Sequence, residues 1–205
     1  MSDPLSTSIS LAALLISGAT AWLTLFRRGT VRLTQPTFIS FSYDLTPKPE
    51  RPAIPKIFLR SLMYSTGRRG HIIENMFVSL RRGEDQQTFN IWGYGETVNL
   101  VRGSGLYVGE TGVVCNHHFN PPEDAKDFTF QNGEYLIDVF AAVLGWHDPI
   151  HLCSVTLTVP DAAGNELKQP ECAYWFDWGP DSKRYHGHLE RRKIIRAPGY
   201  EVVLS

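Results

Sequence analysis

The chain has 205 residues and a mass of 23.1 kDa, which suits one globular domain of ordinary size with a short additional segment. Its hydrophobic fraction of 42% supports a folded core, and it excludes both a disordered polyelectrolyte and a multi-span membrane protein. Since 20 basic side chains face 21 acidic ones, no overall charge favours nucleic acid as a partner. The 17 glycines and 13 prolines are typical of a turn-rich all-β fold.

The first predicted element is a membrane-spanning helix. The run from Ser8 to Phe26 carries no charged side chain and can be extended back to Leu5. At about 1.5 Å per residue it covers roughly 28 Å, close to the thickness of the hydrocarbon core of a bilayer. Because the run is apolar on every side, we expect an uncleaved anchor over residues 1–29 rather than a buried core helix.

A cleaved secretory signal is the alternative for this segment, since Ala19-Thr20-Ala21 has the small-x-small spacing of a cleavage site. Against it, no Lys or Arg precedes the apolar run. The residues expected at the membrane are Trp22, Arg27, Arg28 and Arg32, with lipid as one partner.

The charges that flank the apolar run predict its orientation. Three arginines follow the run, whereas only Asp3 precedes it, so the positive-inside rule places the C-terminal domain in the cytoplasm of a single-pass protein of the cell membrane. The three cysteines, Cys115, Cys153 and Cys172, form no disulfide framework, which is typical of a compartment where thiols stay reduced.

The rest of the chain predicts short strands. Residues 31–43 are rich in β-branched and aromatic side chains, and Pro36 makes them an edge strand or splits them in two. A proline-rich extended link follows over residues 47–55. Residues 56–65 and 72–80, joined by a turn over residues 67–70, predict a β-hairpin, and further strands are expected over residues 88–94 and 113–119.

The second half continues this rhythm with predicted strands over residues 128–130, 135–143 and 151–159. One short helix is expected over residues 162–168, with Asp161 able to cap its first turn. The spacing of turns and the lack of a long amphipathic helix favour an antiparallel sandwich or barrel over residues 30–171. We expect residues 172–205 to form an extension that packs on it, with a last edge strand over residues 202–204.

One segment sharpens the expected fold. Residues 130–139, FQNGEYLIDV, place a Gly-containing turn just before Tyr135 and an alternating strand after it. This segment resembles the tyrosine corner of immunoglobulin-like β-sandwiches, in which the tyrosine hydroxyl bonds to the upstream backbone. The resemblance implies an all-β, antiparallel immunoglobulin-like sandwich after the N-terminal helix. A simple hairpin with an Asn132-Gly133 turn and a core tyrosine is the alternative.

Two residue pairs could offer soft ligands to a metal. Cys115 with His117, and His151 with Cys153, are spaced i, i+2, so each pair would project from one face of a strand. If the two strands were neighbours, a tetrahedral zinc site would be possible. The alternative is buried cysteine with surface or satisfied histidine, and no other cofactor is indicated.

Arginine doublets in predicted turns are the candidate contacts for a protein partner. They are Arg68, Arg69, Arg81 and Arg82. If several of them shared the membrane-proximal end, each would contribute about 1 kcal/mol of attraction to an anionic leaflet. Scattered solubilising charge is the alternative. Trp92, Tyr94 and Trp175 could instead stack on carbohydrate if they were exposed, although most such rings lie in cores.

These observations favour a membrane-anchored, non-enzymatic protein-interaction module. A Cys/His metal-binding protein or enzyme is the first alternative. An extracytoplasmic glycan-binding sandwich is the second.

Overall fold

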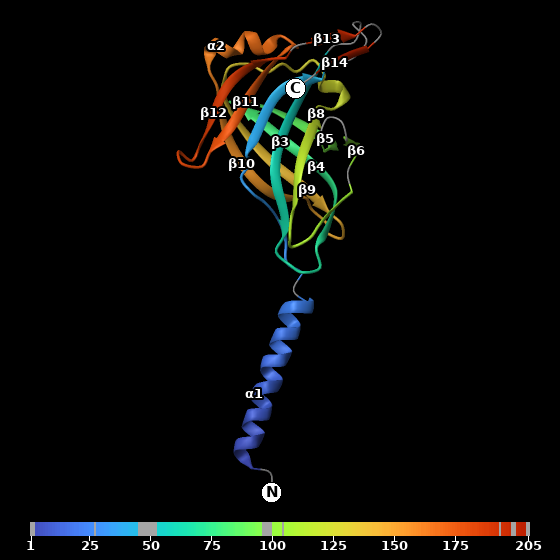
Figure 1. The fold of residues 1–205 in the computed structure, drawn as a ribbon, viewed down its shortest axis with the longest axis vertical. Coiled ribbons are helices and arrows are strands. Elements are labelled where there is room, and N and C mark those ends of the chain that lie inside the picture. Colours follow the sequence, from blue (N-terminus) through green and yellow to red (C-terminus); the bar gives the residue numbers. More distant parts are fainter. Residues whose placement is uncertain are drawn as a thin grey trace.

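The computed structural model describes residues 3–26, 28–44, 53–95, 100–103, 105–192, 194–197 and 200–203. It has a curved β domain from one end of which a long helix extends (Figure 1).

The N-terminal helix is confirmed. Helix α1 (Pro4–Ala21) begins with Asp3 as its N-cap, whose carboxylate accepts a hydrogen bond from the backbone of Leu5 at 3.1 Å, and it continues into a π-helical turn η1 (Trp22–Phe26). None of the residues of α1 is buried. The segment Pro4–Thr24, 21 residues, is long and apolar enough to cross a membrane.

Most of the hydroxyl groups of α1 and η1 are satisfied within the helix itself. Four of them donate to the carbonyl four residues earlier at 2.7 to 2.9 Å, from Ser8, Ser10, Thr20 and Thr24. Such bonds remove the cost of placing a free hydroxyl in hydrocarbon. The moderately polar composition of α1 is therefore compatible with a membrane span.

The remaining described elements are short helices and strands. The strands are β1 (Val31–Leu33), β2 (Phe38–Asp44), β3 (Ile54–Ser65), β4 (His71–Arg82), β5 (Asp85–Tyr94), β6 (Val101–Arg102), β7 (Leu106–Val108), β8 (Val113–Asn120), β9 (Gly133–Val143), β10 (Ile150–Val159), β11 (Cys172–Gly179), β12 (Arg184–Arg191), β13 (Ile194–Ala197) and β14 (Tyr200–Val203). The short helices are η2 (Glu123–Ala125), α2 (Asp161–Gly164) and η3 (Glu166–Lys168).

Twelve of these strands form one continuous antiparallel sheet. Its main path runs β10-β9-β4-β5-β8-β3-β2-β11-β12, with β1 paired to β3, β6 to β5 and β7 to β4, while β13 and β14 pair separately. The sheet curls until β10 comes close to β1 and β12, which makes it a nearly closed barrel (Figure 1). The all-β class is confirmed. The division into two sheets that defines an immunoglobulin-like sandwich is not confirmed.

Alternating side chains fill the barrel interior. In β3, Ile57, Leu59 and Met63 point inward and are fully buried, while Phe58, Arg60 and Leu62 on the other face are more exposed. Phe41 lies at the centre of an aromatic cluster, stacked on Phe130 with ring centroids 4.6 Å apart and edge-on to others. Each large buried side chain contributes roughly 1.5 to 3 kcal/mol of transfer free energy.

The hydrogen bond expected of a tyrosine corner is present. The Tyr135 hydroxyl donates to the Gln131 carbonyl at 2.8 Å and accepts from the Gln131 amide at 2.8 Å. It therefore fixes the turn that leads into β9, and it satisfies two backbone groups of the same residue.

The predicted hairpin of residues 56–65 and 72–80 does not form. Strand β3 pairs with β1, β2 and β8, whereas β4 pairs with β5, β7 and β9. Near the connecting turn, the short strands β1 and β7 occupy the edges that a hairpin would need. Pro36 does split its segment into β1 and β2, but β2 lies inside the sheet between β3 and β11.

The tail from residue 172 is part of the same sheet over much of its length. Strand β11 pairs with β2 on one side and with β12 on the other, so its aromatic residues contribute to the core. The short helix after β10 is present as α2 and η3, but Asp161 does not cap it; its carboxylate accepts from the Asn132 side chain at 2.5 Å. The predicted strand 202–204 falls within β14 except for residue 204, which lies outside the described residues. Of the proline-rich link predicted over residues 47–55, residues 47–52 also lie outside the described residues, and its last two residues belong to β3.

Candidate functional site

The four candidate partner-binding arginines lie at opposite ends of β4. Arg68 and Arg69 are in the β3–β4 turn, and Arg81 and Arg82 are the last residues of the 12-residue strand. At about 3.3 Å per residue the two pairs are separated by roughly 36 Å along β4. They do not form one surface.

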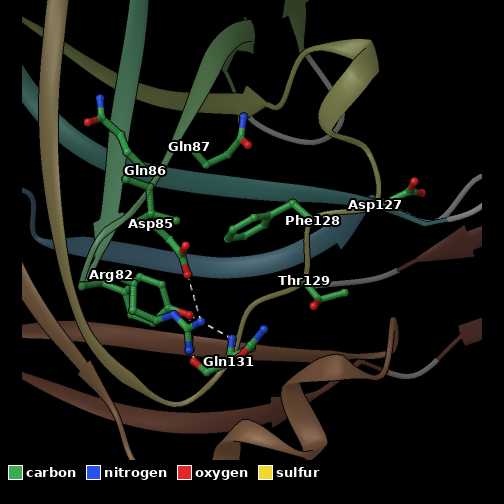
Figure 2. A pocket seen from close by; sticks show the side chains of 10 residues that line it. Arg82, Asp85, Gln86, Gln87, Asp127, Phe128, Thr129 and Gln131 are labelled. Atoms are coloured by element: carbon green, nitrogen blue, oxygen red, sulfur yellow. Dashed lines mark hydrogen bonds and ion pairs between the residues drawn. The ribbon is translucent and has the colours of Figure 1, made fainter.

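Arg81 and Arg82 are engaged by neighbouring groups. Arg81 donates to the Asp138 carboxylate at 2.9 Å. Arg82 lies 3.5 Å from the Asp85 carboxylate and donates to the carbonyl of Asn132 at 3.2 Å. Figure 2 shows Arg82 and Asp85 on one wall of a pocket of about 390 Å³ at this end of the barrel, with Phe128, Thr129 and Gln131 on another wall.

Arg68 and Arg69 lie instead at the end of the barrel that carries the helix. Their turn is joined to the segment after the helix by three hydrogen bonds between Thr30 and Thr66, two of 2.8 Å and one of 3.2 Å. Gly29 is so close to Gly67 that an added Cβ would lie 2.4 Å from the Gly67 nitrogen. Residues 28–30, which connect the helix to the β domain and which we call the tether, are therefore packed against this turn.

Exposed apolar side chains surround the same end. These side chains belong to the β9–β10 loop, to the start of β4 and to β7. Their exposed fractions run from 39% for Trp146 to 58% for Tyr107. The set is Ile72, Tyr107, Leu144 and Trp146, and together with Arg28, Arg68 and Arg69 we call it the rim. Its parts are in contact, since Tyr107 donates to the Arg69 carbonyl at 3.3 Å and Leu144 donates to the Ile72 carbonyl at 2.9 Å.

The other residues expected at the membrane are arranged as follows. Trp22 is exposed on the helix and stacks on Phe26, with ring centroids 5.6 Å apart. Arg28 and Arg32 are exposed, and Arg27 lies outside the described residues.

The first candidate metal pair points into the barrel. Cys115 and His117 are buried neighbours on β8. Burial, with His118 adding repulsion, lowers the pKa of His117 to about 4, and burial raises the pKa of the Cys115 thiol to about 11. Neither ring nitrogen of His117 has a hydrogen-bond partner among the described residues, and the same holds for the buried hydroxyl of Ser61 on the adjacent strand β3.

The second candidate pair does not share a face of its strand. A β-bulge lies between His151 and Cys153, so that His151 pairs with Phe140 while Cys153 pairs with Val139. Val139 is a core residue, so Cys153 faces inward and His151 faces outward. Strands β5, β4 and β9 separate this pair from β8 in the sheet. Among the residues that the structure describes, no group of three or more His, Cys, Asp or Glu side chains is placed to hold a metal.

An outward polar cluster on β9 and β10 has no counterpart among the residues predicted from the sequence. The Asp138 carboxylate accepts from Ser154 at 2.5 Å and from Arg81, and it lies 3.3 Å from His151 Nε2. Burial raises the pKa of Asp138, but these three hydrogen bonds outweigh burial and hold it below its usual value.

This Ser, His and Asp set lacks the geometry of a catalytic relay. His151 Nε2 lies 3.0 Å from Ser154 Oγ and also faces Asp138, so the serine and the carboxylate meet the same ring nitrogen. A relay needs them on opposite nitrogens. The cluster therefore acts as a structural ion pair on β9 and β10. No periodic signal could have found it, because the bulge sets its register.

The barrel is not fully closed, and two strand edges remain open. In the described part of the chain, β10 pairs only with β9, and β12 pairs only with β11. Between them lies a groove of about 460 Å³, which we call the seam. It is lined by Gln35, residues 154–158, Phe176, Trp178 and residues 183–185.

A pocket of about 290 Å³ lies on the outer face of the barrel, over β2, β3, β8 and β11. We call it the outer-face pocket, and its lining residues are Phe38, Ser40, Ser42, Lys56, Phe58, Gly95, His118, Ala173, Trp175 and Arg192. The sequence signal for it is the alternation in β2, where Phe38, Ser40 and Ser42 face outward between the core residues Ile39, Phe41 and Tyr43. Trp175 belongs to this pocket, whereas Trp92 contacts Arg102 at 5.5 Å elsewhere on the sheet.

Comparison with protein-family models, with curated proteins and with solved structures finds no match to this chain.

Proposed function

We propose that the chain is a membrane-anchored, non-enzymatic protein-interaction module, with α1 crossing the cell membrane once and the β domain in the cytoplasm. The single observation that carries this proposal is the composition of the rim. Four large, exposed apolar side chains and three arginines, Arg28, Arg68 and Arg69, lie together on the end of the barrel that holds the helix.

Such a surface suits a cytoplasmic leaflet. Aromatic side chains such as Trp146 and Tyr107 favour the headgroup region, and each arginine near an anionic surface contributes about 1 kcal/mol. Because the helix already holds the β domain at the membrane, the rim binds the leaflet without a further loss of the translational freedom of the domain. We therefore assign Arg68 and Arg69 to lipid and not to the protein partner.

The partner is proposed to bind at the seam. Open edges of β10 and β12 offer backbone donors and acceptors to an extended segment of another protein, which could add as a strand. Ser154, Thr156 and Thr158 of β10 give the groove a polar wall, and Lys183 and Arg184 give the opposite wall two cations. An acidic extended segment would complement these charges.

An immunoglobulin-like relationship of the barrel is also a proposal. What supports it is the tyrosine corner, with its two 2.8 Å hydrogen bonds to Gln131 at the start of β9.

The partner site can be tested by photo-cross-linking of the full chain in its native membrane. A photoreactive side chain at Thr156 in the seam should give a discrete cross-linked product, which a matched position at Glu84, in the exposed β4–β5 turn, should not give. The product should disappear when Lys183 and Arg184 are both changed to Glu, and it should persist when Arg68 and Arg69 are changed in the same way. A product that is insensitive to charge reversal in the seam would contradict the proposal.

A further inference from the structure

The outer-face pocket gathers polar groups, and one of them, on Arg192, lacks a partner in the described part of the chain. Ser40 and Ser42, which are 5% and 6% exposed, line this pocket with hydroxyl groups. Arg192 Nε is buried and has no hydrogen-bond partner, although another nitrogen of the same guanidinium donates to the Pro170 carbonyl at 2.6 Å. Buried polar groups are normally paired, so the unpaired Nε of Arg192 indicates a missing acceptor at this pocket.

Aromatic rings form the other wall of the pocket. Phe38 packs edge-on against Phe58 and Trp175, with ring centroids 5.6 and 5.3 Å apart. Phe58 continues this row to His118 at 4.9 Å. Because the side chains come from four adjacent strands, the wall is rigid, and it suits a flat apolar group.

The charges around the pocket favour a ligand with a single negative charge. Lys56 is already paired with the Asp44 carboxylate at 2.5 Å. Arg192 has no ion pair within 4.0 Å among the described residues, and it is the cation left to bind an anion. A planar guanidinium matches the fork of a carboxylate, and one unpaired cation balances one negative charge.

We propose that the outer-face pocket binds a small aromatic carboxylate, whose carboxylate is held by Arg192 and the two serine hydroxyls and whose ring lies against Phe58 and Trp175. The volume of about 290 Å³ is at the small end of the range for ligand pockets. The pocket lies on the opposite side of β2 and β3 from the core, and it includes none of the rim or seam residues. This binding site is therefore independent of the membrane anchor and of the protein partner.

Titration calorimetry on the full chain in nanodiscs tests the proposal with 2-naphthoate as the probe, after subtraction of the heat from empty nanodiscs. We expect saturable binding at one site, and binding of the uncharged 2-naphthamide weaker by about ten-fold or more. The Arg192→Gln variant should weaken naphthoate binding by a similar factor, and Arg192→Lys should fall between the two because it keeps the charge and loses the fork. Lys168→Gln, which removes an exposed cation outside the rim, the seam and the outer-face pocket, is the matched control and should leave the affinity unchanged.

Three results would overturn the assignment: no saturable binding of 2-naphthoate, equal affinity for the acid and its amide, or an unchanged affinity in Arg192→Gln. The comparison of acid with amide uses the unmodified chain, so it decides the question even if substitution of Arg192 disturbs folding. Loss of the cross-link at the seam with intact naphthoate binding would contradict the proposed function while supporting this site.

Discussion

Replacing Tyr135 by Phe removes one oxygen atom from the core and tests the tyrosine corner directly. The hydroxyl serves both the amide and the carbonyl of Gln131, each at 2.8 Å, and Tyr135 is only 1% exposed. Leaving buried polar groups without partners costs about 1 to 3 kcal/mol each. Because Gln131 is partly accessible to water, we expect a loss of about 2 kcal/mol in the free energy of unfolding.

The matched control is Tyr43→Phe. Tyr43 is also buried, but among the described residues its hydroxyl accepts one hydrogen bond, from the amide of Phe130 at 3.3 Å, and donates none, so its removal should cost about 1 kcal/mol or less. Urea unfolding of the full chain in detergent micelles, followed by tryptophan fluorescence, measures both variants. The slope of the transition should not change. A Tyr135→Phe variant as stable as the unmodified chain, or no less stable than Tyr43→Phe, would refute the reasoning.

Three further predictions concern the tether, the core histidine and the polar cluster. Gly29→Ala should destabilise the chain more than Gly83→Ala in thermal unfolding. Both glycines have positive φ, at +66° and +59°, but only Gly29 has backbone within reach of a new Cβ. Equal losses of stability would argue against close packing of residues 28–30 on the β3–β4 turn. The His117 pKa of about 4 lies below its value in the unfolded chain, so stability should be full above about pH 6.5 and decrease as the pH falls toward 4. The His117→Leu variant should lose this decrease when the free energy of unfolding is measured over that pH range. An unaltered profile would count against burial of the ring. Ser154→Ala should raise the lowered pKa of Asp138. A lowered carboxyl pKa gives stability that is present above the unfolded value of about 3.9 and lost as the pH falls through the folded value, so the acid transition measured by circular dichroism should move to higher pH. A transition that does not move would show that the hydrogen bond from Ser154 is unimportant.

The sequence predicts the features that depend on local composition. The helix of residues 4–21 follows from an uncharged run of the right length, and its hydroxyls bond to the carbonyls that helical geometry puts in reach. Strand positions follow from β-branched and aromatic runs between glycine and proline turns. The tyrosine corner is local as well, because only four residues separate Tyr135 from Gln131.

Strand pairing could not be predicted in the same way. The edges of β3 and β4 are occupied by β1 and β7, and nothing in residues 56–80 indicates this. One inserted residue at Leu152 turns Cys153 inward and His151 outward, so the i, i+2 rule fails there. The outer-face pocket joins residues from 38 to 192 in the sequence, and only the register of four strands brings them together.

Sidedness is the most direct test of the account as a whole. Gly83 lies in the exposed turn between β4 and β5 with open space around it, so Gly83→Cys provides a thiol at the end of the barrel far from the helix. A membrane-impermeant maleimide should label this variant only after the cells are permeabilised, and it should leave the unmodified chain, whose three cysteines are buried or half-buried, weakly labelled. Strong labelling of Gly83→Cys on intact cells would place the β domain outside and contradict the proposed orientation.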